Sequence, residues 1–326
     1  MPLTARHVKN LPGRKTDVAD ATWLAQLGAH GLVRGSFVPP EPIRRLRDLT
    51  RTRTSITRER SREVQRLERL LEDSGIKLSS VATDIMGVSS RSMIEALIRG
   101  DRDVVRMADL AQRRMRAKIP RLTEALVGRF TEHHAFLAQL HLNLIDQHTD
   151  VITQLIARIG EVMEPFRGFH DLVRTIPGIG PLTADVIVAE TGGHVAVPHR
   201  EAPRLVGWHH AGEQRVRGTG EVQPHPPRNP YLQGALGVAA MSIARAPSTY
   251  LNARYRRIAM RRGPHKANVA IQHALLLTIR TMATTGAAYD DPGADYYTRR
   301  RPEQAKQRAI HQLEAMGYRV SLDKAS

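Results

Sequence analysis

The chain has 326 residues, of which 49 are lysine or arginine and 32 are acidic, giving a formal net charge of +17. This excess favours a polyanionic partner, either nucleic acid or an anionic membrane surface. The absence of cysteine excludes disulfides and thiolate metal sites. Residues 1–10 have no apolar centre, and no run is long and apolar enough for a bilayer, so we expect a cytoplasmic protein with no membrane partner.

The first 40 residues predict a basic loop followed by a helix that Thr16 or Asp17 caps. Asp17 and Asp20 are three positions apart, so both carboxylates project from one face of that helix. Carboxylates placed in this way can hold Mg²⁺. Capping and simple solvation are the alternative, and the spacing alone favours it.

Beyond a rigid break at residues 36–40, apolar residues at nearly heptad spacing predict a long helix over 41–72, ended by Ser74 and Gly75. Arg53 and Arg60 fall near its apolar seam. Its surface carries many more arginines: Arg44, Arg45, Arg47, Arg51, Arg58, Arg62, Arg66 and Arg69. They indicate either a solvated coiled-coil face or a helix that lies along a nucleic-acid backbone, and the sequence does not choose between these interpretations.

Short helices are expected over residues 79–86, 90–99 and 104–118, and a second long helix over about 121–166. Together, residues 41–166 predict an antiparallel coiled-coil hairpin with short helices at its tip. We expect this hairpin also to make the chain a homo-oligomer. The histidines along the second helix are interpreted as surface residues rather than metal ligands.

Residues 172–190 predict two helices joined by a tight turn through Pro177, Gly178 and Gly180. The pattern favours a helix-hairpin-helix, in which bare amides at a helix N-terminus accept a nucleic-acid phosphate, over an ordinary corner between helices. The predicted nucleic-acid-binding residues are Arg174, Gly178, Ile179, Gly180 and Thr183. Contact of this kind gives affinity without sequence choice.

Residues 193–228 are rich in glycine, proline and histidine, show no sustained period and predict an irregular segment. Helices are expected again from residue 230, over 249–262 with many arginines, over 266–284 as a core helix, and over 302–316, before a strand-like tail at 318–322. The fold class is therefore mainly α. The expected units are 1–40, the hairpin 41–166, a helical domain 167–292, and a C-terminal helix and tail 293–326.

Several motifs occur in a characteristic order. They are Gly13-Arg14-Lys15-Thr16-Asp17-Val18-Ala19-Asp20-Ala21, Phe37-Val38-Pro39-Pro40, Ile176-Pro177-Gly178-Ile179-Gly180, Asn229-Pro230-Tyr231-Leu232 and Gly293-Ala294-Asp295-Tyr296-Tyr297. In this order the chain resembles the insertion-sequence (IS) one-ten family of transposases, over nearly its whole length.

The resemblance implies a RuvC-like domain with a DEDD set of acids for a divalent metal, a coiled coil, and a C-terminal transposase domain with a reactive serine. It also implies DNA and a structured guide-type RNA as partners. Asp17 and Asp20 match the last two acids, which makes them the expected catalytic and metal-binding residues, with Mg²⁺ as cofactor. Metal-bound carboxylates neutralise phosphoryl charge and help to generate a nucleophile.

The chain departs from this pattern in two places. The two earlier acids and most of the RuvC-like sheet would belong upstream of Met1, and residues 193–228, where the serine is expected, contain no serine. Ser242 falls in an apolar helical run. We interpret residues 193–228 as a frameshifted replacement, a hypothesis that the nucleotide sequence of the gene tests. The expected function is a transposase, as a catalytically impaired copy; the alternative is a non-catalytic remnant that dimerises and binds DNA or RNA.

Overall fold

The computed structural model describes residues 17–30, 39–192 and 229–322, and within these ranges every regular element is a helix. The prediction of a mainly α fold is confirmed. The α-helices are α2 (Asp17–Ala29), α3 (Glu41–Asp73), α4 (Val88–Ile98), α5 (Val104–Asp109), α6 (Ile119–Ala125), α7 (Glu132–Val162), α8 (Arg167–Arg174), α9 (Pro181–Thr191), α11 (Pro230–Arg245), α12 (Tyr250–Arg262), α13 (Pro264–Thr285), α14 (Tyr296–Arg300) and α15 (Pro302–Ala315).

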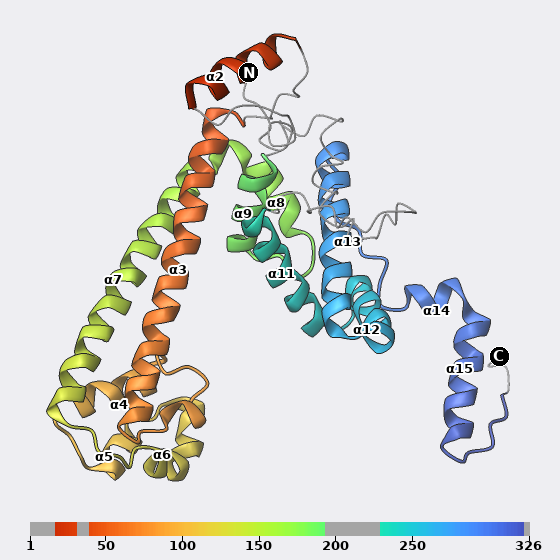
Figure 1. Cartoon of the computed structure of the whole chain (residues 1–326). Helices are drawn as coiled ribbons and strands as arrows, with labels where there is room; N and C mark the ends of the chain where they lie inside the picture. The colour runs from red at the N-terminus through yellow and green to blue at the C-terminus, as the bar shows by residue number, and fades with distance from the viewer. Residues whose placement is uncertain (1–16, 31–38, 193–228, 323–326) are drawn as a thin grey trace.

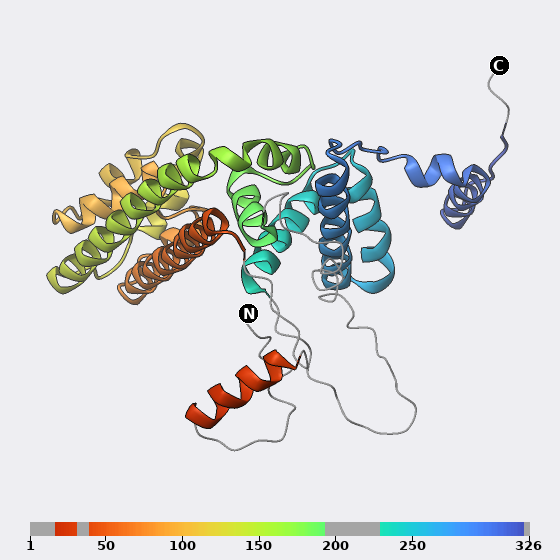
Figure 2. The ribbon, with the colours of Figure 1, turned by 90° about the horizontal axis from the view of Figure 1, so that it is seen from above.

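Helices α3 and α7 run side by side in opposite directions and form a long arm (Figure 1). Short helices α4, α5 and α6 close the tip of the arm, and α8, α9, α11, α12 and α13 form a bundle beside its base. Helices α14 and α15 extend away from this bundle (Figure 2). The predicted hairpin of two long helices is therefore present, whereas knobs-into-holes packing between them stays a prediction.

The first long helix has the predicted bounds, and the second does not. Helix α3 ends at Asp73, where Ser74 follows and Gly75 adopts a φ of +85°. The second long helix begins at Glu132 rather than near residue 121. A Cβ at Gly128 would lie 2.6 Å from the Ser74 carbonyl oxygen, so the chain turns tightly against the end of α3 there. Thr131 and His134 then cap α7.

The tip differs from the prediction in two further places. Residues 79–86 form no α-helix, since only a 3₁₀ turn at Leu78–Ser80 is present. The helix expected over 104–118 is divided into α5 and a 3₁₀ helix at Arg113–Lys118. The division occurs where Arg113 takes a positive φ of 50°, a conformation that an α-helix cannot accommodate.

Two separate apolar cores stabilise the arm, one at each end. The tip core includes Leu67, Leu71, Met93, Leu97, Leu122 and Leu142. The base core includes Leu46, Ile159, Val173, Ile187, Leu236 and Ile271. Between them α3 and α7 also make polar contacts: His141 Nδ1 lies 3.0 Å from Glu63 Oε2, and Arg60 Nε donates to Thr149 Oγ1 at 2.8 Å. Arg60 therefore faces the partner helix, as its place near the predicted seam indicated.

A buried carboxylate joins the arm to the bundle. The Glu190 side chain has no exposed surface, and both of its oxygens accept hydrogen bonds from Arg51, at 2.7 and 2.8 Å. Arg47 donates to the carbonyls of Ala189 and Glu190 at the end of α9. Asn229, which caps α11, donates to Glu190 Oε2 at 2.8 Å. One side chain of α9 thus holds α3 and the start of α11.

The protonation of this carboxylate follows from its partners. Burial by itself raises the pKa of Glu190, but hydrogen bonds from Arg51 and Asn229 and the charges of Arg51 and Arg47 outweigh burial, so the pKa lies below its ordinary value. Glu190 is therefore ionised at neutral pH, and its charge is matched by the two guanidinium groups.

A second buried contact involves Arg53, two residues after Arg51 on α3. Arg53 Nη1 donates to Asp185 Oδ2 at 2.6 Å, and Arg53 Nη2 donates to the Leu182 carbonyl at 2.9 Å. His170 Nε2, from α8, lies 3.2 Å from the other oxygen of Asp185. The hydrogen bonds of Arg53 therefore fix α3 to α9 where water scarcely reaches, and His170 of α8 lies buried beside them.

The prediction of a strand-like tail after the last helix is wrong. Residues 318–322 follow α15 without forming a strand, because no other described segment offers an extended edge to pair with. Among the described residues, no helix has the length and apolarity needed to cross a membrane.

We expect Glu190→Gln to lower the free energy of unfolding at pH 7 by about 3 kcal/mol, since it leaves two partly buried guanidinium groups without their counter-charge. Because folding lowers the pKa of Glu190, its stabilisation is complete above about pH 4.5 and is lost as the pH falls through the folded-state pKa. Urea unfolding of both proteins should therefore show a constant gap at neutral pH that narrows below pH 4.5.

The matched control is Glu41→Gln, which removes the exposed pair with Arg45 at the start of α3. Its effect should be close to zero. An equal loss of stability in both variants would contradict the anchoring role of Glu190.

Candidate nucleic-acid interface

The predicted turn between two helices is present at residues 175–180, between α8 and α9. Gly180 is exposed and precedes α9 with extended backbone angles (φ −84°, ψ 172°). Among the described residues, no group accepts a hydrogen bond from the amides of Gly180 or Leu182. The N-terminus of α9 therefore presents free backbone donors to solvent, the arrangement to which anions bind.

The predicted binding residues of this turn have different environments. Gly178 has a φ of +89°, and a Cβ there would lie 2.7 Å from Ile243 Cγ1 on α11. Ile179 is buried in the base core. Gly178 and Ile179 therefore pack the turn against the bundle, while Gly180, exposed Arg174 and half-buried Thr183 remain at the surface. Arg174 Nη1 lies 3.5 Å from Asp171 Oδ1.

The two candidate metal ligands lie at the start of α2, which begins at Asp17 as predicted. Asp17 and Asp20 are one helical turn apart, so the backbone places them on one side of α2, and carboxylate oxygens are ligands that suit Mg²⁺. Their side chains lie outside the part of the chain that the structure describes, as do residues 193–228. Within the described part, no three His, Cys, Asp or Glu side chains are grouped to hold a metal ion.

The arginines of α3 divide into two groups. Some pair with carboxylates of the protein itself: Arg45, Arg47, Arg51, Arg53 and Arg66. Others are exposed and pair with no carboxylate of the described residues: Arg44, Arg58, Arg62 and Arg69. The first group shows that part of the positive charge on this helix is neutralised within the protein, and the second leaves a surface open to an external anion.

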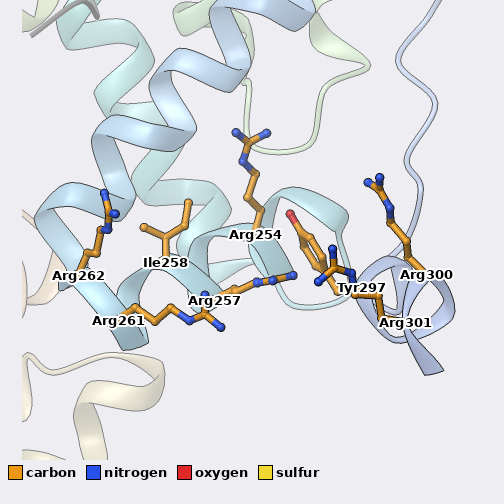
Figure 3. Close-up of a pocket in the computed structure, with 8 residues that line it drawn as sticks. All are labelled: Arg254, Arg257, Ile258, Arg261, Arg262, Tyr297, Arg300 and Arg301. Atoms are coloured by element: carbon orange, nitrogen blue, oxygen red, sulfur yellow. The ribbon is translucent and has the colours of Figure 1, made fainter. Parts of the chain in front are cut away.

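A hollow between α12 and the region of α14 is lined by more unpaired arginines than α3 exposes (Figure 3). Its volume is about 430 Å³, and one tyrosine, one isoleucine and six arginines line it. The lining residues are Arg254, Arg257, Ile258, Arg261, Arg262, Tyr297, Arg300 and Arg301. No carboxylate of the described residues makes an ion pair with these six arginines, so the hollow keeps its full positive charge and attracts anions.

Three tyrosines hold the two sides of the hollow together. Tyr250, at the start of α12, packs against Tyr296 and Tyr297 of α14, with ring centroids 4.9 and 5.8 Å away. The Arg257 guanidinium lies 4.6 Å from the centroid of the Tyr297 ring. Asp291 accepts a hydrogen bond from the Tyr250 amide at 2.9 Å and so fixes the connection that leads to α14.

Tyr297 adds no negative charge to the hollow. Burial and a hydrogen bond with Tyr250 raise the pKa of Tyr297 to about 12, against the opposing influence of Arg254 and Arg257. Its hydroxyl therefore stays protonated at neutral pH and can only offer neutral hydrogen bonds.

The sequence indicated a basic helix here but not the hollow. A usable signal was present, since Arg254, Arg257 and Arg261 recur at the three- and four-residue steps that place side chains on one helical face. Such steps usually mark an apolar face. The partners from α14 could not be found in this way, because they come from a separate segment.

Fold and surface together define a mainly helical, strongly basic protein with several cationic areas that no acid of its described part neutralises. Residues 1–75 match the family model of the IS110 (one-ten) DEDD type. The description of that family is "Transposase". The family recognised from the motifs is thus confirmed for this N-terminal segment, and residues 76–326 lie outside the match. No curated protein matches the chain.

We expect Gly178→Ala to lower the free energy of unfolding by about 2 kcal/mol or more, because φ is positive and the new methyl group meets α11. Gly180→Ala should leave stability nearly unchanged, since a Cβ there meets no atom within 4 Å. Thermal unfolding of the two variants checks this contrast, and similar melting temperatures would contradict the role assigned to Gly178.

Proposed function

We propose that the chain is the DNA transposase of an insertion sequence and acts by holding DNA while strands are cut and exchanged. The match of residues 1–75 to the transposase model carries this proposal. The net charge of +17 and the cationic areas of α3, α9 and α12 support it, because DNA is the polyanion on which a transposase acts.

The proposed contacts reach the phosphate backbone rather than base edges. The open N-terminus of α9, with Gly180 and Thr183, accepts one phosphate in a helix-hairpin-helix manner, and Arg174 on α8 adds a nearby cation. Exposed arginines of α3 offer a second track, suited to the shape and phosphates of a structured guide-type RNA. Such contacts give position and affinity but no sequence choice.

Asp17 and Asp20 are the proposed catalytic and metal-binding residues, and their spacing on α2 fits a shared divalent cation. Mg²⁺ bound there would neutralise phosphoryl charge and activate a nucleophile. Two carboxylates supply only part of a coordination shell, and residues 193–228 contain no serine. We therefore propose a catalytically impaired copy, in which the remaining residues still bind and orient DNA.

The alternative is a non-catalytic remnant that binds DNA or RNA without cutting it. One observation favours it: the unpaired arginines and the open end of α9 belong to the arm and the bundle and need neither Asp17 nor Asp20. Binding would thus persist if cutting were lost.

A homo-oligomer formed through the arm is the proposed assembly. Helix α7 exposes an apolar stripe at helical spacing, with Phe136 65 %, Leu140 44 %, Leu144 39 % and Val151 39 % exposed. These residues lie on a different side of α7 from Ala138, Leu142 and Ile145, which are buried in the tip core. A second copy of the arm would cover the stripe and remove it from water.

The enzyme proposal predicts slow, Mg²⁺-dependent cleavage of DNA that carries the element's ends, as expected of an impaired copy, and loss of this residual activity in Asp17→Ala. Asp150→Ala, which removes an exposed acid of α7, is the control and should cleave like the unmodified chain. Cleavage is measured on labelled DNA, with binding measured in parallel at several salt concentrations. No cleavage by the unmodified chain, with salt-sensitive binding retained, would support the remnant; absence of binding would contradict both.

The assembly proposal predicts that the double variant Leu140→Glu/Leu144→Glu weakens self-association at least about tenfold, because it places charges in an apolar contact. Val105→Glu/Val127→Glu changes two exposed valines at the tip and carries the same added charge. Light scattering over a concentration series should show dissociation of the first variant only. Equal behaviour of the two would show that α7 is not the interface.

A further inference from the structure

We propose that the arginine-lined hollow between α12 and α14 binds a single strand of nucleic acid rather than the surface of a duplex. This inference rests on the proposed function and specifies the form of nucleic acid that one site takes. A site for a single strand suits a transposase, because a strand leaves its duplex when DNA ends are exchanged.

The size of the hollow carries the first step. At about 430 Å³ it has the volume of a site for one small ligand, such as one nucleotide unit with its phosphate. A duplex is a convex rod and can only lie across the rim of such a hollow. A single strand can bend into it and bring a phosphate among several arginines at once.

The chemistry of the lining carries the second step. Sites for single strands combine a cationic groove, which follows the backbone, with flat or apolar groups for sugars and bases. Here six guanidinium groups supply the charge, while Ile258 and Tyr297 supply apolar surface within it. The lining residues come from α12 on one side and from α14 and the residue after it on the other. The strand would therefore pass between these two helices (Figure 3).

The orientation of one arginine carries the third step. Arg257 lies over the Tyr297 ring, and Tyr250 stacks on the same tyrosine with 25° between the ring planes. Packing of this kind fixes a guanidinium before a ligand arrives and lowers the entropy lost on binding. Because Tyr297 stays neutral and no acid lines the hollow, nothing in the lining repels a phosphate.

The test compares the full chain with Arg257→Gln/Arg261→Gln, using a fluorescent single-stranded oligodeoxynucleotide and a duplex of the same sequence at several salt concentrations. The control is Arg114→Gln/Arg121→Gln, which removes two exposed arginines from the tip and equals the first variant in charge. Circular dichroism and thermal melting show that all three proteins are folded. ATP serves as a competitor, to distinguish a strand from a free nucleotide.

We expect the hollow variant to bind the single strand about tenfold more weakly than the control, with the slope of log K against log salt reduced by about 1.4 for two lost phosphate contacts. Duplex binding should change no more than in the control. An equal loss for strand and duplex, a hollow variant that matches the control, or displacement of the strand by ATP at equal phosphate concentration would overturn the proposal. Failure of the unmodified chain to bind either nucleic acid would instead contradict the proposed function.

Discussion

The arrangement of the molecule depends on the burial of one carboxylate. Glu190 lies at the end of α9, where two arginines of α3 and the cap of α11 converge on it. A buried charge without partners would cost several kilocalories per mole, so these four groups are held as a unit and fix three helices. The apolar core of the base supplies most of the burial, but it is not directional. The ion pairs determine how the arm meets the bundle.

This use of charge separates two roles that look alike in the sequence. Arg47, Arg51 and Arg53 are occupied by acids and carbonyls of α9, so their charge serves the fold. In contrast, the six arginines of the hollow line one space without an acid among the described residues. Their mutual repulsion is a cost that folding does not recover, and an external anion recovers it. The same residue type thus stabilises the protein in one place and prepares it for a ligand in another.

The sequence predicted what depends on local patterns. Helices α3, α11, α12 and α13 followed from apolar spacing and from breakers such as Gly75, since those signals act within a few residues. The start of α7 was wrong because Gly128 packs against Ser74, a contact between segments that periodicity does not report. The pairing of Glu190 with α3 and the meeting of Tyr297 with α12 were missed for the same reason.

Gly178 shows how one motif can carry two meanings. The turn needs the positive φ of Gly178, as the sequence indicated. The space that a side chain there would take is occupied by Ile243 of the bundle and is not open to a ligand. Gly180, two residues later, has open space around it and precedes the free amides of α9. A glycine pattern therefore predicts a sharp turn well. It does not distinguish the glycine that packs from the glycine that admits a partner.

The hydrogen bond between Glu190 and Asn229 joins α9 to the cap of α11 across a long stretch of sequence. These two residues flank the segment 193–228 on its two sides, and their side chains meet at 2.8 Å. Arg51 donates to the same carboxylate, and Asn229 also caps α11. The hydrogen bonds described between α9, α11 and α3 are made by residues on either side of 193–228. These hydrogen bonds, and the arginines that make the surfaces of the bundle and the arm cationic, all belong to described residues outside the segment 193–228.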